Sequence, residues 1–193
     1  MSNLSVADWR IWKNAPTEPP TDVIQAAIDA SEEAIDDRTG RVFAVAGSAT
    51  ARLFAPVSNM STVLEIDDCT SVTSVVAYGT TLDASAYQLE PVGARDYAGR
   101  TVPYSRIRLL YGYWPQATPG EASVSVTGTW GWASLPKRYT EATKILSADL
   151  LEAKDIRNGV IGFSDYAAFR VRDNGQVAAL LQRLTRARAG GPV

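Results

Sequence analysis

A long β-rich segment enclosed by two helical segments is the feature that most constrains the fold of this chain. Residues 21–38, TDVIQAAIDASEEAIDDR, place apolar side chains at helical spacing, and Gly40 follows as a C-terminal cap. From residue 41 to about 128, β-branched and aromatic residues dominate, and Gly, Pro, Asn and Asp interrupt them. After residue 129 the helical spacing returns, so a β region must be inserted between helices.

This order predicts an α+β protein with two domains. Residues 1–40 and 129–193 form a small helical bundle, because a single terminal helix cannot bury its apolar stripe alone. Residues 41–128 form the inserted β domain, which we expect to be an antiparallel barrel or a sandwich-like region. Seven short strands are predicted, at residues 41–45, 51–55, 62–66, 72–78, 87–90, 106–111 and 122–127.

The stretch TGTWGWASLP, residues 127–136, marks the return from strand to helix. Gly128 lies two residues before Trp130, and Gly131 separates Trp130 from Trp132. Pro136 lies where the first turn of the next helix is expected. Two interpretations fit this pattern. The tryptophans cover the junction between sheet and helix, or they form an aromatic surface that stacks on sugars or bases.

The composition removes several classes of chemistry. The 193 residues include no histidine and one cysteine, Cys69, which excludes histidine-based triads, histidine-ligated zinc and a thiolate metal cage. No cofactor or metal is therefore expected. The formal net charge of −2 gives no electrostatic case for wrapping nucleic acid, and no apolar run is long enough to span a membrane.

Acidic residues form two groups with different possible roles. Glu65 and Asp68 could act as a carboxylate pair in a hydrolase, although a polar turn between strands is the favoured explanation. Asp29, Glu33, Asp36 and Asp37 belong to the predicted helix over residues 21–38. They either form an ordinary solvated face, or they line a channel whose negative charge repels passing DNA.

The C-terminal segment combines an apolar stripe with arginines. Arg183, Arg186 and Arg188 could contact phosphate, but a basic terminal helix with a loose tail also suits docking into a protein partner.

These features occur together in an order that resembles a known family. The stretches are AAIDASEEAIDDRTGRVF at residues 26–43, LEIDDCTSVTSVVAYG at 64–79, VTGTWGWASLPKRYTEATKILSADLLEAKD at 126–155 and GQVAALLQRLTR at 175–186. They resemble the head–tail connector proteins, also called adaptor or head-completion proteins, of long-tailed double-stranded DNA bacteriophages. The β insert is larger than the minimal family pattern requires.

The resemblance implies a non-enzymatic virion protein that assembles in the host cytoplasm and resides at the head–tail interface. Such proteins form a ring, commonly of twelve copies, between the portal and the next neck or tail-completion protein. DNA passes through that ring without sequence-specific binding, and no membrane is involved. On this basis the portal-docking residues are Leu184, Arg186, Arg188 and Val193, and a loop toward the neighbouring ring contains Phe163, Asp165, Tyr166 and Phe169.

A second class of function stays open at the level of sequence. A carbohydrate- or surface-binding β module would use Trp114, Trp130 and Trp132 as an exposed surface. Quenching of tryptophan fluorescence by oligosaccharides would separate the two classes, because a connector protein is expected to give no response.

Overall fold

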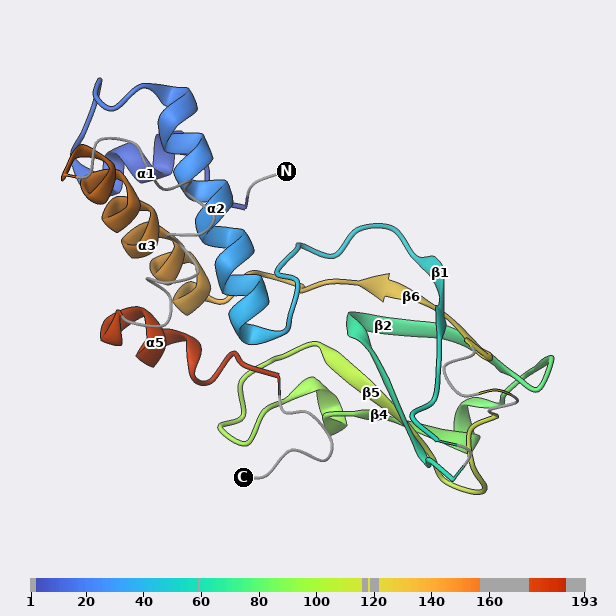
Figure 1. Cartoon of the computed structure of the whole chain (residues 1–193). Coiled ribbons are helices and arrows are strands. Elements are labelled where there is room, and N and C mark those ends of the chain that lie inside the picture. The colour runs from blue at the N-terminus through green and yellow to red at the C-terminus, as the bar shows by residue number, and fades with distance from the viewer. Residues whose placement is uncertain (1–2, 59, 116–117, 119–121, 157–173, 187–193) are drawn as a thin grey trace. The chain divides into compact units, whose positions relative to one another are not determined.

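The computed structural model describes residues 3–58, 60–115, 118, 122–156 and 174–186 (Figure 1). The chain divides into two compact units. The helical unit contains residues 1–43 and 135–193, and the β unit contains residues 44–134.

The described part of the helical unit contains four α-helices: α1 (Val6–Lys13), α2 (Thr21–Thr39), α3 (Lys137–Ile156) and α5 (Gly175–Leu181). Helix α1 begins at Ser5, whose side chain accepts a hydrogen bond from the backbone N–H of Asp8. Helix α2 ends at Gly40, which adopts a left-handed conformation with φ of 64°. No described helix combines the length and the apolar character that crossing a bilayer demands.

Helices from both ends of the chain share one core. Helix α3 packs against α2 and α5, and the buried positions include Ile24, Ile28, Leu146 and Leu150. The indole N–H of Trp9 donates to the Ser147 hydroxyl over 2.9 Å, which fastens α1 to α3. These contacts bury the apolar stripes that periodicity predicts for α2 and α3.

The β unit is one antiparallel sheet. Its strands are β1 (Thr50–Phe54), β2 (Val63–Ala77), β3 (Thr80–Thr81), β4 (Tyr87–Glu90), β5 (Tyr104–Leu109) and β6 (Val124–Trp130). The order across the sheet is β1-β6-β2-β5-β4, and β3 pairs only with β2. Short 3₁₀ turns at Ala84–Ala86 and Val92–Ala94 flank β4. Strand β6 alternates strictly between buried and half-buried residues, so one face of the sheet covers the core.

The expectation of a barrel is wrong, because the sheet is open. No pairing joins β1 to β4 at the two ends of the strand order. Strand β4 has only four residues, and Pro91, which follows it, has no N–H to donate to a neighbouring strand. The mixed α+β class is confirmed, and the sheet replaces the expected barrel or sandwich.

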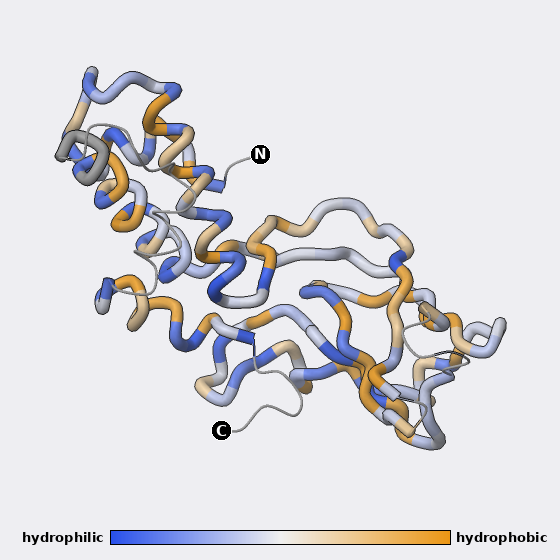
Figure 2. The backbone as a smooth tube through the Cα atoms, in the orientation of Figure 1, coloured by the Kyte–Doolittle hydropathy of each residue, from blue (hydrophilic) through white to orange (hydrophobic). Residues whose placement is uncertain are grey.

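Two strand predictions also need correction. The strands predicted at residues 62–66 and 72–78 are one continuous strand, β2, which pairs with β5 along its first half and with β6 along its second. The strand predicted at residues 41–45 is reduced to an isolated parallel bridge between Val45 and Trp132. Figure 2 shows apolar segments along the strands and the helices, in keeping with a separate core in each unit.

Candidate functional site

The GTWGW stretch is fully built into the β unit: Gly128 and Trp130 belong to β6, and Gly131 and Trp132 follow it. Trp130 is 7% exposed and its indole N–H donates to the Thr50 carbonyl over 2.8 Å. Its ring packs beside Phe54, and the Arg52 guanidinium lies 4.8 Å from the ring centroid. Trp132 is 4% exposed, so both rings are structural side chains.

Glycine is required at two positions of this stretch, Gly128 within β6 and Gly131 directly after it. A Cβ on Gly131 would lie 2.5 Å from the Ala44 carbonyl oxygen, and its φ of 114° disfavours any L side chain. A Cβ on Gly128 would lie 2.6 Å from the Ser71 carbonyl oxygen, beside the register shifts of β2. The Gly131 N–H donates to the Asp68 carbonyl over 2.7 Å, and the Trp132 N–H donates to the Ala44 carbonyl over 2.8 Å.

The tryptophans offer no binding surface. Trp114 is 1% exposed, and its indole N–H donates to the Thr62 carbonyl over 3.0 Å. With Trp130 and Trp132 also buried, the exposed surface on which a carbohydrate-binding module depends is not present. Pro136, the third residue of the predicted junction, is half-buried and precedes α3 directly.

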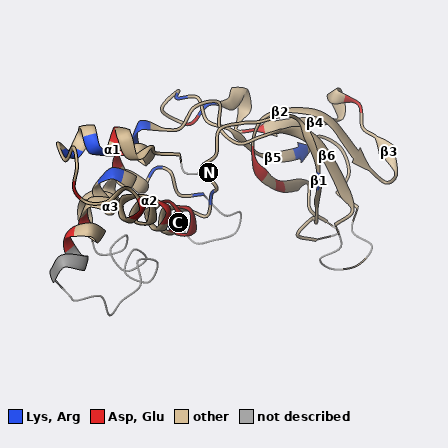
Figure 3. Cartoon of the chain, turned by 90° about the horizontal axis from the view of Figure 1, so that it is seen from above, with Lys and Arg blue, Asp and Glu red and all other residues tan. Residues whose placement is uncertain are grey.

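Four acidic residues of α2 differ in their environments. Asp29, Glu33 and Asp37 are exposed, on the helix side opposite the buried Ile24, Ile28 and Ile35. Acidic segments along α2 are visible in Figure 3. The exposed three leave a negatively charged stripe on the surface of the helical unit.

Asp36 is the exception within that acidic group. It is half-buried, and its Oδ1 accepts a hydrogen bond from the Phe43 N–H over 3.4 Å. Burial is the main cause that raises the pKa of Asp36 to about 6. The Phe43 hydrogen bond opposes this rise, and the neighbouring carboxylates of Glu32 and Asp37 contribute to it. Asp36 therefore changes charge in a pH range where ordinary aspartates do not.

Part of the expected portal-docking segment is described. Leu184 and Arg186 are half-buried and follow α5, and the Arg186 N–H donates to the Thr39 carbonyl over 2.8 Å. The remaining expected residues of this segment, Arg188 and Val193, lie outside the described residues, as do Phe163, Asp165, Tyr166 and Phe169.

The two carboxylates proposed for a hydrolase differ in their burial. Asp68 is buried at 7% exposure, whereas Glu65 is half-buried on the same strand. Their neighbour Asp67 forms an ion pair with Arg52 over 2.6 Å. Within the described ranges, no three His, Cys, Asp or Glu side chains gather as metal ligands.

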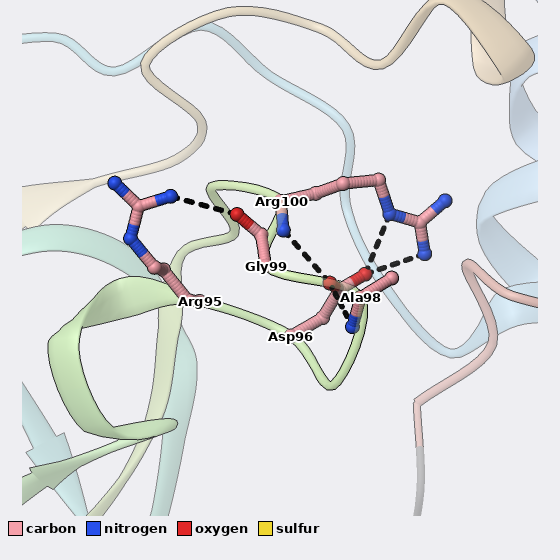
Figure 4. Close-up of polar contacts among 5 residues, drawn as sticks. All are labelled: Arg95, Asp96, Ala98, Gly99 and Arg100. Atoms are coloured by element: carbon pink, nitrogen blue, oxygen red, sulfur yellow. Dashed lines mark hydrogen bonds and ion pairs between the residues drawn. The ribbon is translucent and has the colours of Figure 1, made fainter.

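An ordered loop outside the core presents an exposed aromatic side chain, Tyr97. Figure 4 shows that Asp96 accepts hydrogen bonds from the backbone of Ala98 and Arg100 and from the Arg100 guanidinium. The Arg95 guanidinium donates to the Gly99 carbonyl over 2.7 Å. These contacts hold the loop in shape while Tyr97 is 84% exposed. Sequence analysis did not single out this loop.

Comparison with solved structures gives the fold a context. No protein-family model matches the sequence, and no curated protein does. A structure described as the neck of an empty gene transfer agent (GTA) particle, computed with C6 symmetry, is 22% identical with a TM-score of 0.57. The match covers 97% of this chain and 92% of that chain.

Two further structures agree with this match. The neck of the native GTA particle, computed with C12 symmetry, is 20% identical with a TM-score of 0.55, over 96% of this chain and 91% of that chain. The virion of the native GTA particle contains a chain that is 21% identical with a TM-score of 0.56, over 97% of this chain and 92% of that chain. Nearly the whole chain thus shares its fold with chains of the GTA neck and virion structures, which agrees with the resemblance found in the sequence.

Proposed function

We propose that this chain is a structural, non-enzymatic neck protein of a long-tailed phage or phage-like particle. In this role it forms a ring between the portal and the tail, extends the DNA channel and docks the next neck component. The observation that carries the proposal is the match of 96% of the chain to a neck computed with C12 symmetry. That symmetry supports a ring of twelve copies.

The charge of the molecule suits a channel through which DNA passes. The formal net charge is −2, and Asp29, Glu33 and Asp37 form an exposed acidic stripe on α2. We assign this stripe to the channel side of the ring, where like charge keeps the DNA backbone from adhering. Sequence-specific DNA contacts are not part of the proposal.

The C-terminal segment that begins at Leu184 is the proposed portal contact. Arg186 is bonded to the end of α2 through its backbone, so the chain leaves the helical core from a defined point. A loop within residues 158–172 is proposed to face the neighbouring ring.

Imaging of the purified protein with its cognate portal tests the ring. We expect an annulus with twelvefold symmetry on the portal in negative stain, and the protein alone serves as the reference. A portal that gains no density after incubation with the full chain would reject the neck proposal.

A truncation tests the docking segment separately. Deleting residues 187–193 leaves the backbone hydrogen bond of Arg186 in place. We expect the affinity of the truncated chain for the portal, measured by co-sedimentation, to fall at least about tenfold. The Tyr97→Ser variant is the control, since Tyr97 belongs to an ordered loop of the β unit. Equal binding by the truncated and full chains would exclude residues 187–193 as the portal contact.

A further inference from the structure

The residues before α1 lie across helix α2 and are held there by one carboxylate. The Asn3 backbone N–H donates to both carboxylate oxygens of Glu32, over 2.9 and 3.1 Å, and the Leu4 N–H donates to Glu32 Oε1 over 3.1 Å. Leu4 is 4% exposed, so its side chain belongs to the core of the helical unit. We call residues 3–5 the N-terminal strap.

The Asn3 side chain connects the N-terminal strap to two further segments. Its Nδ2 donates to the Phe43 carbonyl and, over 3.1 Å, to the Tyr139 hydroxyl oxygen. The rings of Phe43 and Tyr139 stack with their centroids 4.4 Å apart, and both residues are buried. The strap therefore joins α2, the segment after α2 and the start of α3 at one corner of the helical unit.

A second carboxylate of α2 belongs to the same corner. Asp36 lies four residues after Glu32, so the two side chains are neighbours on one side of the helix. Asp36 Oδ1 accepts the hydrogen bond from the Phe43 N–H, while the Phe43 carbonyl accepts the one from Asn3. A continuous series of hydrogen bonds thus runs from Asp36 through Phe43 and Asn3 to Glu32.

The charge of Asp36 is unfavourable at this corner. Burial is the main cause of its raised pKa of about 6, and the carboxylates of Glu32 and Asp37 contribute to the rise. From α3, Tyr139 faces the same corner, and burial together with Glu32 raises the pKa of its hydroxyl far above the usual value. Tyr139 therefore stays neutral, whereas Asp36 changes charge between pH 5 and 7.

The neighbouring cations do not reverse this preference. Arg41 is half-buried in the segment after α2, and Arg186 is bonded to Thr39 through its backbone N–H. The exposed Arg38 lines a groove beside α5, and the N-terminal strap has no charged side chain. With these groups present, the pKa of Asp36 still lies above its ordinary value of 3.8.

We propose that protonation of Asp36 controls how tightly the N-terminal strap is held. Release of the strap takes Asn3 away from the Phe43 carbonyl and admits water to the corner, so Asp36 ionises more readily in the released state. The docked state then binds more protons than the released state. By linkage, docking of the strap is strongest at acidic pH and weakens as the pH rises through about 6. The inference concerns contacts within the helical unit and does not depend on the proposed neck function.

Amide hydrogen exchange by NMR on the full chain tests this coupling. Protection factors for the Asn3 and Leu4 amides remove the intrinsic effect of pH on exchange, and they report release of the strap. We expect these protection factors to fall about five- to tenfold between pH 5 and pH 7.5. The chemical shift of the Phe43 amide, which donates directly to Asp36, should titrate with a midpoint of about pH 6.

Two variants assign the effect to one side chain. Asp36→Asn keeps an acceptor for the Phe43 N–H but has no charge to gain, so protection of the strap should be the same at both pH values. Glu33→Gln is the matched control, because it removes a carboxylate from an exposed position of the same helix and should keep the pH dependence of the wild type.

Either of two results would overturn the proposal. Strap protection that stays constant while the Phe43 amide titrates would show that Asp36 ionises without loosening the strap. An undiminished pH dependence in Asp36→Asn would assign the effect to another group. Neither result bears on binding to the portal, which imaging tests separately.

Discussion

At the scale of single residues, the two glycines of the GTWGW stretch act by letting backbones approach. Gly131 has a φ of 114°, and the Ala44 carbonyl oxygen lies close to the position that a Cβ would occupy. Gly128 lies against the Ser71 carbonyl of β2. The tryptophans beside them are buried and anchor the end of β6. The stretch is thus specified by sterics at the glycines and by packing at the tryptophans.

A substitution at Gly131 should show how much this close approach matters. We expect Gly131→Ala to lower the free energy of unfolding of the β unit by about 2–4 kcal/mol, because the new Cβ would meet the Ala44 oxygen at 2.5 Å in a strained conformation. Urea denaturation, followed by tryptophan fluorescence, measures this change in the free energy of unfolding. Gly47→Ala is the matched control, since nothing lies within 4 Å of its Cβ position, and a comparable loss there would refute the steric explanation.

Asp36 should make the helical unit sensitive to pH. Its pKa rises from 3.8 to about 6 on folding, so the folded state binds more protons between these values and this contribution to stability is lost as the pH rises through about 6. A rise of this size corresponds to at most about 3 kcal/mol. Because Asp36 is only half-buried, we expect Asp36→Asn to stabilise the protein by about 1–2 kcal/mol at pH 8 and by almost nothing at pH 4.

Chemical denaturation at the two pH values checks this difference. The asparagine Oδ1 can still accept the Phe43 N–H, so the variant removes the charge and keeps the hydrogen bond. Glu33→Gln removes the same charge from an exposed position of α2 and should change stability by less than about 0.5 kcal/mol at either pH. A gain for Asp36→Asn that is equal at pH 4 and pH 8 would rule out titration as its cause.

At the scale of elements, the helices were more predictable than the strands. The predicted helix over residues 21–38 is α2, Thr21–Thr39, because its apolar stripe at Ile24, Ile28 and Ile35 is the face that α3 covers. The sequence around Asp67 and Asp68 suggests a turn, but the chain continues as β2 there. Pairing with β5 on one side and β6 on the other overrides this local preference.

Helix α5 is seven residues long and depends on one side chain at its start. Asn174 accepts hydrogen bonds from the N–H groups of Gln176 and Val177, and its Nδ2 donates to Asp149 of α3 over 2.7 Å. Asn174 therefore caps α5 and fastens it to α3 at the same time. A capping residue could be predicted near this position, but its bond to Asp149 is a tertiary contact that no local pattern reveals.

Two substitutions separate these roles of Asn174. We expect Asn174→Ala to cost about 1–2 kcal/mol, because the cap and the bond to Asp149 are both lost. Asn174→Asp keeps an N-cap acceptor but places its carboxylate beside that of Asp149. We expect the repulsion between them to destabilise the protein at neutral pH as well. The double variant Asp149→Asn/Asn174→Asp restores a donor and an acceptor, and hydrogen exchange in α5 should return toward the wild-type rate. Exchange that stays fast in the double variant would show that the Asp149 contact contributes little.

At the scale of the whole molecule, the change from helical spacing to β-branched and aromatic residues and back was enough to predict an inserted β region between helices. Closure of that region was not predictable, because it depends on whether two edge strands pair, and the four-residue β4 next to Pro91 ends the sheet. The approach of three loops of the β unit was also missed. These loops are separate in sequence, and hydrogen bonds such as the one from the Tyr78 hydroxyl to the Tyr113 carbonyl hold them together.

The bridge between Val45 and Trp132 has a consequence for the replacement of the β unit. Because the backbone of Ala44 is bonded to that of Trp132, the inserted unit begins and ends at almost the same point in space. A different module could be grafted there, or the present one replaced by a short linker, without stretching the connection between α2 and α3. The β unit could therefore be exchanged while α2 and α3 keep their contacts with each other.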